Sequence, residues 1–334
     1  MDPPPQRFGF KIDEPLIGKR LDVVLSDQLE DCSRSYAAHL IQEGAVAVNG
    51  KPCKPSYRVR LNDTVEGKLP APTLCEFKAE PIALSILYED AHLLVVDKPQ
   101  GLVVHPAPGN FQGTLVNALL HHCPDLAAFS GEIRPGIVHR LDKDTTGALV
   151  VAKAPAVHEH LARQFKQRTV RKVYLAIVRG EMKTAQGVVR LPIGRHPVHR
   201  KRMTTSASRT RPAETHYRVR ERLPGATLLE LDLKTGRTHQ IRVHCAALHH
   251  PILGDRVYGG RHATCLKPGD RDRARQTFRV ERQMLHAWQL GFIHPVDGRW
   301  RQFETGIPGD MQALLAFLRR GGDSSQAGGN AVGA

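Results

Sequence analysis

The sequence lacks the features that mark membrane and secreted proteins. No segment approaches the roughly 20 consecutive apolar residues that a membrane-spanning helix needs. The N-terminal stretch MDPPPQRFGF has no basic segment followed by an apolar core, which a secretory signal peptide would show. We therefore expect neither membrane insertion nor secretion.

Motifs for nucleotides and metals are also missing. No GxGxxG opens a helix and no GxxxxGKS or GxxxxGKT occurs, so we expect no nucleotide cofactor. The 18 histidines include no HExxH, and no Cys/His set has zinc-ligand spacing, so we expect no metal and no other cofactor. The six cysteines form no CxxC pair and no compact disulfide spacing, which favours a reducing cytoplasmic location. They are Cys32, Cys53, Cys75, Cys123, Cys245 and Cys265.

Acidic and aromatic residues are scarce. The 33 acidic residues are outnumbered by 48 Lys and Arg, which gives a formal net charge of +15. Such an excess favours a polyanionic partner through phosphate neutralisation, although an acidic membrane surface would also attract it. Aromatic residues make up only 5%, too few for broad platforms that stack an unstructured single strand.

Composition divides the chain into four parts. Residues 1–15 are polar and rich in proline, so we expect a flexible lead-in. Residues 16–77 have the pattern of a small compact unit, and a Pro-containing stretch separates them from a larger domain at residues 78–320. Residues 321–334 are rich in Gly, Ser and Ala and predict a disordered tail.

Within residues 16–77 the pattern predicts two helices followed by a hairpin. Ser33 stands where the N-cap of the second helix is expected, and Gly44 can end that helix. Asn49-Gly50 is typical of a tight turn between two strands, and residues 57–65 predict another strand pair. The apolar positions that give the helices a buried face are Leu21, Val24, Leu25 and Leu29, then Ala37, Leu40 and Ile41.

This order of helices, turns and basic residues resembles the S4 RNA-binding domain. The matching stretches are residues 18–22, 33–35, 44–50 and Asp63. The alternative is that the basic residues only keep the surface soluble. The resemblance implies a phosphate-binding patch formed by Arg20, Arg34, Ser35, Lys51, Lys54 and Arg58.

From Ile82 onwards, short β-branched apolar runs alternate with turn residues and a few helical stretches. The mixture predicts an α+β domain rather than a strict βαβ repeat. Between two such runs, the segment HRLDKDTTG contains Asp142. Asp is common in turns because its side chain bonds the local backbone, which is the simplest interpretation. A carboxylate can also act as a covalent nucleophile when its neighbours keep it ionised and aimed.

Four segments in order resemble the motifs of the RluA-type pseudouridine synthases. They are residues 96–106 (VDKPQGLVVHP), 139–147 (HRLDKDTTG), 172–174 (KVY) and 235–244 (TGRTHQIRVH). Residues 250–260 continue the likeness, and residues 105–121 resemble most closely the large-subunit ribosomal RNA synthases of the RluD type. The resemblance implies a mixed, mainly antiparallel sheet flanked by helices, which is the pseudouridine synthase fold.

The resemblance also implies roles for individual residues. Asp142 would be the nucleophile, Tyr174 would stack on the target base and could help to remove the C5 proton, and Arg242 would pair with Asp142. Taken alone, Tyr174 is also typical of a half-buried strand, and Arg242 could face either a site or water from a strand. The remaining pocket residues would be His139, Arg140, Leu141 and Leu253, and the basic run Arg200, Lys201 and Arg202 would help to hold RNA unless it is only a solvated loop.

The implied partner is 23S ribosomal RNA or a large-subunit precursor, with the helix 69 stem-loop as the target and a monomeric enzyme acting without cofactor. The residues leave open whether Asp142 attacks C6 of the base or C1′ of the sugar. Two alternatives remain at this point. One is a non-catalytic S4-type ribosome-assembly factor, and the other is a carboxylate-based hydrolase.

Overall fold

The computed structural model describes residues 6–29, 32, 34–69, 78–105, 112–124, 126, 135–199, 202–259, 265–266 and 278–323. The chain divides into two compact units, Met1–Glu76 and Phe77–Ala334, which are described separately. No helix in the described ranges is long and apolar enough to cross a membrane.

The first unit is a four-stranded antiparallel sheet with two helices. Its strand order is β1-β4-β2-β3. The core contains Leu21, Val24 and Leu25 of α1 together with Leu40 and Ile41 of α2, as the apolar spacing predicts. The elements are β1 (Gln6–Lys11), a 3-10 turn (Glu14–Leu16), α1 (Leu21–Gln28), α2 (Arg34–Gln42), β2 (Val46–Val48), β3 (Lys51–Pro52) and β4 (Thr64–Leu69).

Two expectations for this unit are wrong. Residues 6–11 are not a flexible lead-in, because they form β1, which pairs with β4 while Phe8 and Phe10 pack on the core. The polar, Pro-rich composition masked this alternation of Phe with other residues. The strand pair expected at residues 57–65 is mostly a loop, in which the Asp63 carboxylate accepts hydrogen bonds from the Tyr57 hydroxyl and the Arg60 N–H. Ser33, the expected N-cap, lies outside the described residues.

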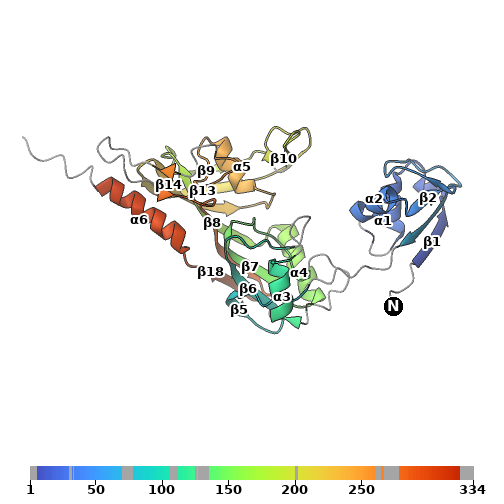
Figure 1. Cartoon of the computed structure of the whole chain (residues 1–334), viewed down its shortest axis with the longest axis horizontal. Coiled ribbons are helices and arrows are strands. Elements are labelled where there is room, and N and C mark those ends of the chain that lie inside the picture. Colours follow the sequence, from blue (N-terminus) through green and yellow to red (C-terminus); the bar gives the residue numbers. More distant parts are fainter. Residues whose placement is uncertain are drawn as a thin grey trace, which may run out of the picture. The chain divides into compact units, whose positions relative to one another are not determined.

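The second unit is built on a nine-stranded mixed sheet, shown in Figure 1. The order is β5-β6-β7-β17-β8-β14-β13-β9, with β18 also paired to β17. Among the described pairs of this sheet only β17 and β7 are parallel, so the mainly antiparallel α+β architecture is confirmed. The strands are β5 (Ser85–Glu89), β6 (Leu93–Lys98), β7 (Thr146–Ala152), β8 (Arg171–Arg179), β9 (Gln186–Val189), β13 (Thr215–Leu223), β14 (Ala226–Leu233), β17 (Leu285–Ile293) and β18 (Trp300–Glu304).

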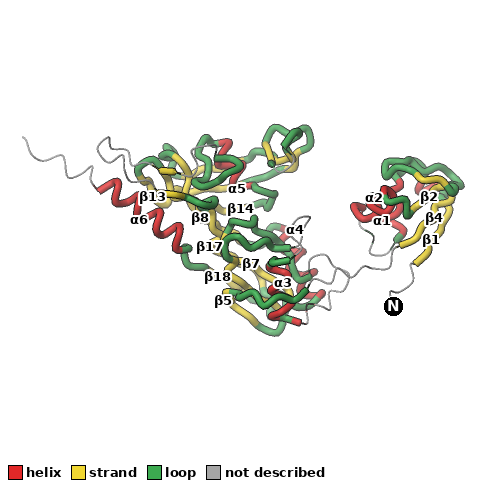
Figure 2. The backbone as a smooth tube through the Cα atoms, viewed as in Figure 1, coloured by secondary structure: helices red, strands yellow, loops and turns green. Residues whose placement is uncertain are grey.

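Smaller elements complete this unit, and Figure 2 shows how loops connect them. A three-stranded sheet has the order β11-β10-β12, and β15 pairs with β16. Helix α6 extends through Asp323, so the predicted start of a disordered tail at residue 321 is too early. Residues 324–334 lie outside the described part of the chain. The elements are β10 (Ile193–Arg195), β11 (Met203–Thr204), β12 (Thr210–Arg211), β15 (Cys265–Leu266), β16 (Phe278–Arg279), α3 (Leu115–His122), α4 (Pro155–Gln167), α5 (Gln240–Ala247) and α6 (Gly309–Asp323).

The strands β6 and β7 are buried on both faces. Leu93 and Val95 of β6 share a core with Leu161 of α4, whereas Leu94 and Val96 share another core with α3. Successive side chains of a strand point to opposite faces, so these two helices cover opposite sides of this half of the sheet. Helices α5 and α6 contact β13 in the other half. Helices thus pack against both halves of the sheet.

Candidate active site

The order of the sheet brings three distant segments together. The loop that carries Asp142 leads directly into β7, and Tyr174 lies in β8, which is separated from β7 only by β17. Strand β14 pairs with β8 and is followed by the loop that opens α5, where Arg242 lies. The three residues line one small cavity of about 60 Å³, together with Arg140, Leu141 and His239.

Arg242 connects two carboxylates. Its Nη1 donates to Asp142 Oδ2 at 2.9 Å, while its Nε and Nη2 donate to the two oxygens of Asp255 at 2.7 and 2.9 Å. Arg242 is 6% exposed, Asp255 is fully buried and Asp142 remains 18% exposed. The buried bidentate pair fixes the guanidinium, and its Nη1 holds Asp142, whose carboxylate lines the cavity.

The pairing of Arg242 with Asp255 keeps both of these side chains charged. Burial alone would lower the pKa of Arg242, but hydrogen bonds and charge attraction from Asp255 and Asp142 raise it above its ordinary value. Burial alone would raise the pKa of Asp255, but Arg242 and the backbone N–H groups of Val257 and Tyr258 lower it on balance. Arg242 therefore presents a permanent positive charge to Asp142.

The expectation that Arg242 lies on a strand is wrong. It belongs to α5, within the helical segment Gln240–Ala247. The alternating apolar pattern Ile241, Arg242, Val243 imitates a strand, but all three side chains are buried because α5 is covered on several sides. Gln240 fixes the start of this helix by bonding Thr235, the Arg237 N–H and the Glu214 carbonyl.

Tyr174 is 8% exposed and its phenol lies among apolar side chains. Burial raises its pKa, and the negative charge of Asp142 raises it further. The hydroxyl is therefore neutral at pH 7 in the free protein. The ring offers an apolar aromatic face to the cavity.

His239 is a further residue of the cavity. It has a left-handed backbone with φ of 56°, which is uncommon for residues other than glycine. Its Nε2 lies 3.8 Å from Asp142 Oδ2, and its Nδ1 lies 2.8 Å from the Tyr258 hydroxyl. The guanidinium groups of Arg242 and Arg202 lie over the Tyr258 ring, 5.2 and 5.6 Å from its centroid. Burial lowers the pKa of His239, so it is mainly neutral.

Two buried cations, Lys98 and Arg282, bind backbone carbonyls of the loop that contains Asp142. The Lys98 ammonium is fully buried and donates to the carbonyls of Pro99, Leu102 and Lys143, at 2.8, 2.9 and 3.0 Å. Burial lowers the pKa of Lys98 to about 8, although Asp144 and Asp142 oppose that shift. Arg282 donates to the Asp144 carbonyl and is held by Asp310. The backbone of Lys143 and Asp144, the two residues after Asp142, is thereby held through its carbonyls.

We expect Lys98→Met to destabilise this unit strongly. It would leave three carbonyls without their donor, of which the Leu102 carbonyl accepts in a fully buried contact. A buried unsatisfied group costs about 1–3 kcal/mol, and the free energy of unfolding should fall by about that amount. Both tryptophans, Trp288 and Trp300, lie in the second unit, so denaturation followed by tryptophan fluorescence measures this unit alone. Lys143→Met, which alters an exposed side chain of the same loop, is the matched control, and equal stability of the two variants would contradict the prediction.

Two of the residues expected at the pocket do not line the cavity. His139 stacks on Phe165 with ring centroids 4.6 Å apart, and its Nε2 accepts the Val150 N–H, so it supports the sheet from another side. Leu253, expected to pack under the pocket, is 1% exposed and belongs to the same apolar core as Tyr174. Arg140, which is exposed, and Leu141, which is buried, do line the cavity.

His139 should make the second unit sensitive to acid. Burial and the nearby Lys172 lower its pKa to about 3, against an ordinary value of 6.5. Because the folded-state pKa is the lower one, the unfolded chain takes up the proton first, so stability present above pH 6.5 is lost as the pH falls toward 3. This group alone should cost about 2 kcal/mol between pH 7 and pH 5.

The measurement is tryptophan-monitored denaturation at both pH values. The stability difference between the parent and His139→Gln should shrink by about 2 kcal/mol at pH 5, because Gln does not titrate. The difference between the parent and His121→Gln, which changes an exposed histidine, should stay constant. An unchanged difference for His139→Gln would show that His139 is not buried in its neutral form.

In the first unit, a buried carboxylate organises part of the expected RNA patch. Asp22 accepts two bonds from Arg20 at 2.9 Å and one from Arg34 at 3.2 Å. Hydrogen bonding from Arg20 lowers the pKa of Asp22. Arg20 and Lys54 line a surface groove of about 580 Å³. Lys51 and Arg58 are exposed, whereas the Ser35 side chain and residues Arg200 and Lys201 lie outside the described part.

Sequence reasoning missed several residues that build the two sites. Lys98, His239, Asp255 and Tyr258 all stand inside the matched segments, but nothing in their spacing gave them a contact with Asp142 or Arg242. Asp22 likewise lies in the S4-like stretch. The available signal was a charged residue within an apolar run, as for Lys98 after LLVVD, because such a residue needs buried partners.

Comparison with known proteins decides the family. Residues 92–247 match the RNA pseudouridylate synthase model and residues 19–65 match the S4 domain model. Ribosomal large subunit pseudouridine synthase D of Nitrosomonas europaea is 46% identical over 316 residues, which cover 92% of this chain and 87% of the relative. The chain belongs to the RluA family of RNA pseudouridine synthases. The protein is thus an isomerase, and the hydrolase alternative has no support.

Other relatives agree with this assignment. The uncharacterized RNA pseudouridine synthase YlyB of Bacillus subtilis is 42% identical to this chain over 304 residues, which cover 91% of this chain and 95% of the relative. The structure of human RNA pseudouridylate synthase domain containing 4 superposes with a TM-score of 0.53 and 27% identity, covering 70% of this chain and 93% of that one. The pseudouridine synthase fold and the S4-type unit expected from the sequence are confirmed.

Proposed function

We propose that the synthase converts specific uridines of large-subunit 23S ribosomal RNA to pseudouridine, with the helix 69 stem-loop as its target. The names of the relatives from Nitrosomonas europaea and from Neisseria meningitidis support the large subunit as substrate. The basic S4 unit and the net charge of +15 supply affinity for RNA phosphates. The choice of helix 69 follows from the RluD-type resemblance of the motifs.

Asp142 is the proposed nucleophile. The observation that carries this assignment is its 2.9 Å bond to Arg242, which holds one partly exposed carboxylate at the cavity that Tyr174 also lines. Asp142 attacks C6 of the base or C1′ of the sugar, the N1–C1′ bond breaks, and the uracil rotates. The base then rejoins C1′ through C5, and the bond to Asp142 breaks. C5 loses its proton and N1 gains one, so the product is an isomer of the substrate. No step requires a redox change or a cofactor.

The cavity and the Tyr174 ring form the proposed binding place for the flipped uracil. The cavity brings the Asp142 carboxylate and the Tyr174 ring together at one place, where a flipped uracil would lie. The exposed Arg140 lies at this cavity, and we assign it to filling the gap left by the flipped nucleotide or to binding phosphate. Tyr174 stacks on the base as a neutral phenol. Removal of the C5 proton by Tyr174 would require its prior deprotonation, because its pKa is raised.

RNA contacts are assigned to both units. Arg20 and Arg34, held by Asp22, and the exposed Lys51, Lys54 and Arg58 contact phosphates of the stem. Arg202, beside the Tyr258 ring, contacts RNA near the cavity. We assign the remaining contacts to Ser35, Arg200 and Lys201. The synthase acts in the cytoplasm as a monomer.

The test is a map of pseudouridines in total RNA from the source organism. Carbodiimide treatment and primer extension would compare a deletion strain with strains complemented by the parent gene or by Asp142→Asn. We expect stops in helix 69 to vanish on deletion and to return with the parent only. Loss of stops in another rRNA helix or in tRNA, with helix 69 unchanged, would overturn the target. Return of the stops with Asp142→Asn would overturn the nucleophile.

A further inference from the structure

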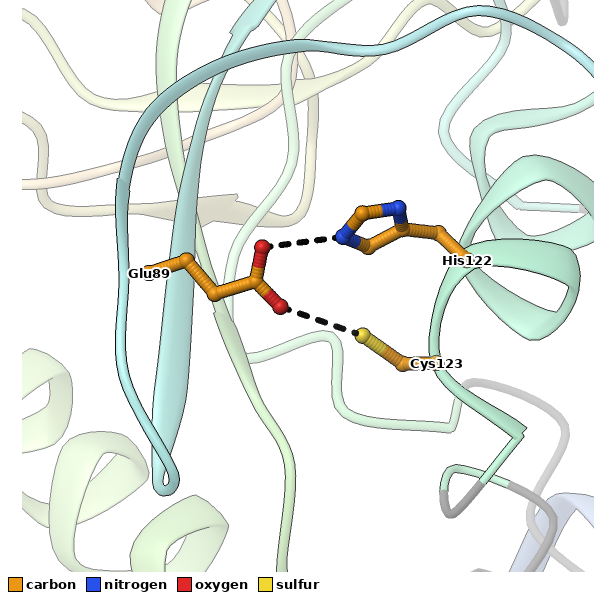
Figure 3. Close-up of side chains that lie close together, drawn as sticks. All are labelled: Glu89, His122 and Cys123. Carbon is orange, nitrogen blue, oxygen red and sulfur yellow. Dashed lines mark hydrogen bonds and ion pairs between the residues drawn. The ribbon is translucent and has the colours of Figure 1, made fainter.

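A cluster of three potential metal ligands lies outside the active site, in the second unit. Glu89 is the last residue of the edge strand β5, His122 is the last residue of α3, and Cys123 caps that helix. Figure 3 shows the three side chains pointing toward one another across the space between the strand and the helix. The carboxylate, imidazole and thiol are three types of group that bind zinc.

Their spacing is close to that of a coordination sphere. Glu89 Oε2 lies 2.9 Å from His122 Nε2, Glu89 Oε1 lies 3.8 Å from Cys123 Sγ, and one ligand atom from each residue lies within 4.8 Å of the other two. Zinc bonds of about 2.0–2.3 Å at tetrahedral angles put ligand atoms roughly 3.4–3.6 Å apart. To reach that spacing, the distance between Oε2 and Nε2 would lengthen from 2.9 Å, and rotation of the Glu89 carboxylate would set the distance from Oε2 to Sγ.

Lys153 fits such a site as an outer partner. Its Nζ donates to Glu89 Oε1 at 2.6 Å and to the Asp90 carbonyl at 2.6 Å. Carboxylates that bind metals are commonly hydrogen-bonded by a further group, which orients them. The hydrogen bond holds Oε1 and leaves Oε2, the oxygen that faces His122, for the metal. With a zinc ion, one thiolate, one carboxylate and the ammonium, the local charge sums to only +1.

We propose that Glu89 Oε2, His122 Nε2 and Cys123 Sγ bind a zinc ion that fastens the end of α3 to the edge of the sheet. A water molecule completes the tetrahedron on the exposed side. Binding replaces the Cys123 S–H bond with a Zn–S bond and releases the proton to solvent. Zinc suits this borderline set of S, N and O donors better than calcium or magnesium, which prefer oxygen alone. The sequence predicted no metal because Glu89 is 33 residues from His122, outside any short motif.

Cobalt titration tests the site, because Co²⁺ replaces Zn²⁺ and reports its ligands by colour. The full-length protein, stripped with EDTA and kept reduced with a phosphine, is titrated with Co²⁺. We expect one equivalent to give an intense thiolate-to-cobalt charge-transfer band and tetrahedral visible bands, both bleached by Zn²⁺. Cys123→Ser should abolish the charge-transfer band. His122→Ala, which changes an exposed residue, should weaken cobalt binding at least about tenfold.

Matched controls separate this site from the other histidines and thiols. His121→Ala alters the adjacent exposed histidine, and Cys53→Ser alters a thiol in the first unit, so both should bind cobalt as the parent does. Zn²⁺ should also raise the unfolding temperature of the parent and of His121→Ala, but not that of His122→Ala. No band with cobalt in excess, or a band that survives in Cys123→Ser, would overturn the proposal.

Discussion

Asp142→Asn should lower the rate of pseudouridine formation by at least about 10⁴-fold, the scale seen when an enzyme loses its nucleophile. Asn has nearly the same shape and can still accept a hydrogen bond from Arg242, but it carries no negative charge. The 2.9 Å contact shows that the carboxylate is already aligned, so little else should change. The measurement is single-turnover release of tritium from RNA labelled at C5 of uridine.

Asp144→Asn is the matched control. Asp144 belongs to the same turn as Asp142. Its backbone carbonyl accepts a hydrogen bond from Arg282, and that bond does not involve the side chain that is changed. Its activity should stay within a few fold of the parent, and RNA binding by both variants should be unchanged. Comparable activity of Asp142→Asn and Asp144→Asn would rule out Asp142 as the nucleophile.

Arg242→Met should abolish activity and also destabilise the second unit. It would leave Asp255, which is fully buried, as an uncompensated charge. Breaking such a buried pair costs about 3–5 kcal/mol, measured by tryptophan-monitored denaturation. Activity should fall because Asp142 loses the 2.9 Å contact that aims its carboxylate.

A double variant separates these two effects. Arg242→Met with Asp255→Asn removes the stranded charge, and the Asn oxygen can still accept from the N–H groups of Val257 and Tyr258. It should recover about 2 kcal/mol of the lost stability, a coupling typical of contacting residues. It should remain inactive, since nothing replaces the Arg242 contact to Asp142. Recovered activity would show that Arg242 only stabilises the fold.

Local pattern was sufficient for much of the architecture. The apolar runs at Leu93–Lys98 and Thr146–Ala152 form strands buried on both faces, and the spacing of Leu21, Val24 and Leu25 gives one helix face. Both signals depend on neighbouring residues alone, so they can be read without a tertiary structure. The same pattern misled at Gln240–Ala247, where Ile241 and Val243 alternate with Arg242 inside a helix. Burial on several sides of a short helix removes the periodicity that distinguishes it from a strand.

The sequence by itself determined the family, through four motifs in order, and it placed Asp142, Tyr174 and Arg242 among the candidate residues. The tertiary structure alone decided how they are held. The bond between Arg242 and Asp142 joins residues 100 positions apart, and the bond from Lys98 to the Lys143 carbonyl spans 45. The tertiary structure also shows that His239 lines the pocket and that His139 does not. Such contacts depend on which strands are neighbours in the sheet, and no local pattern of residue types records that order.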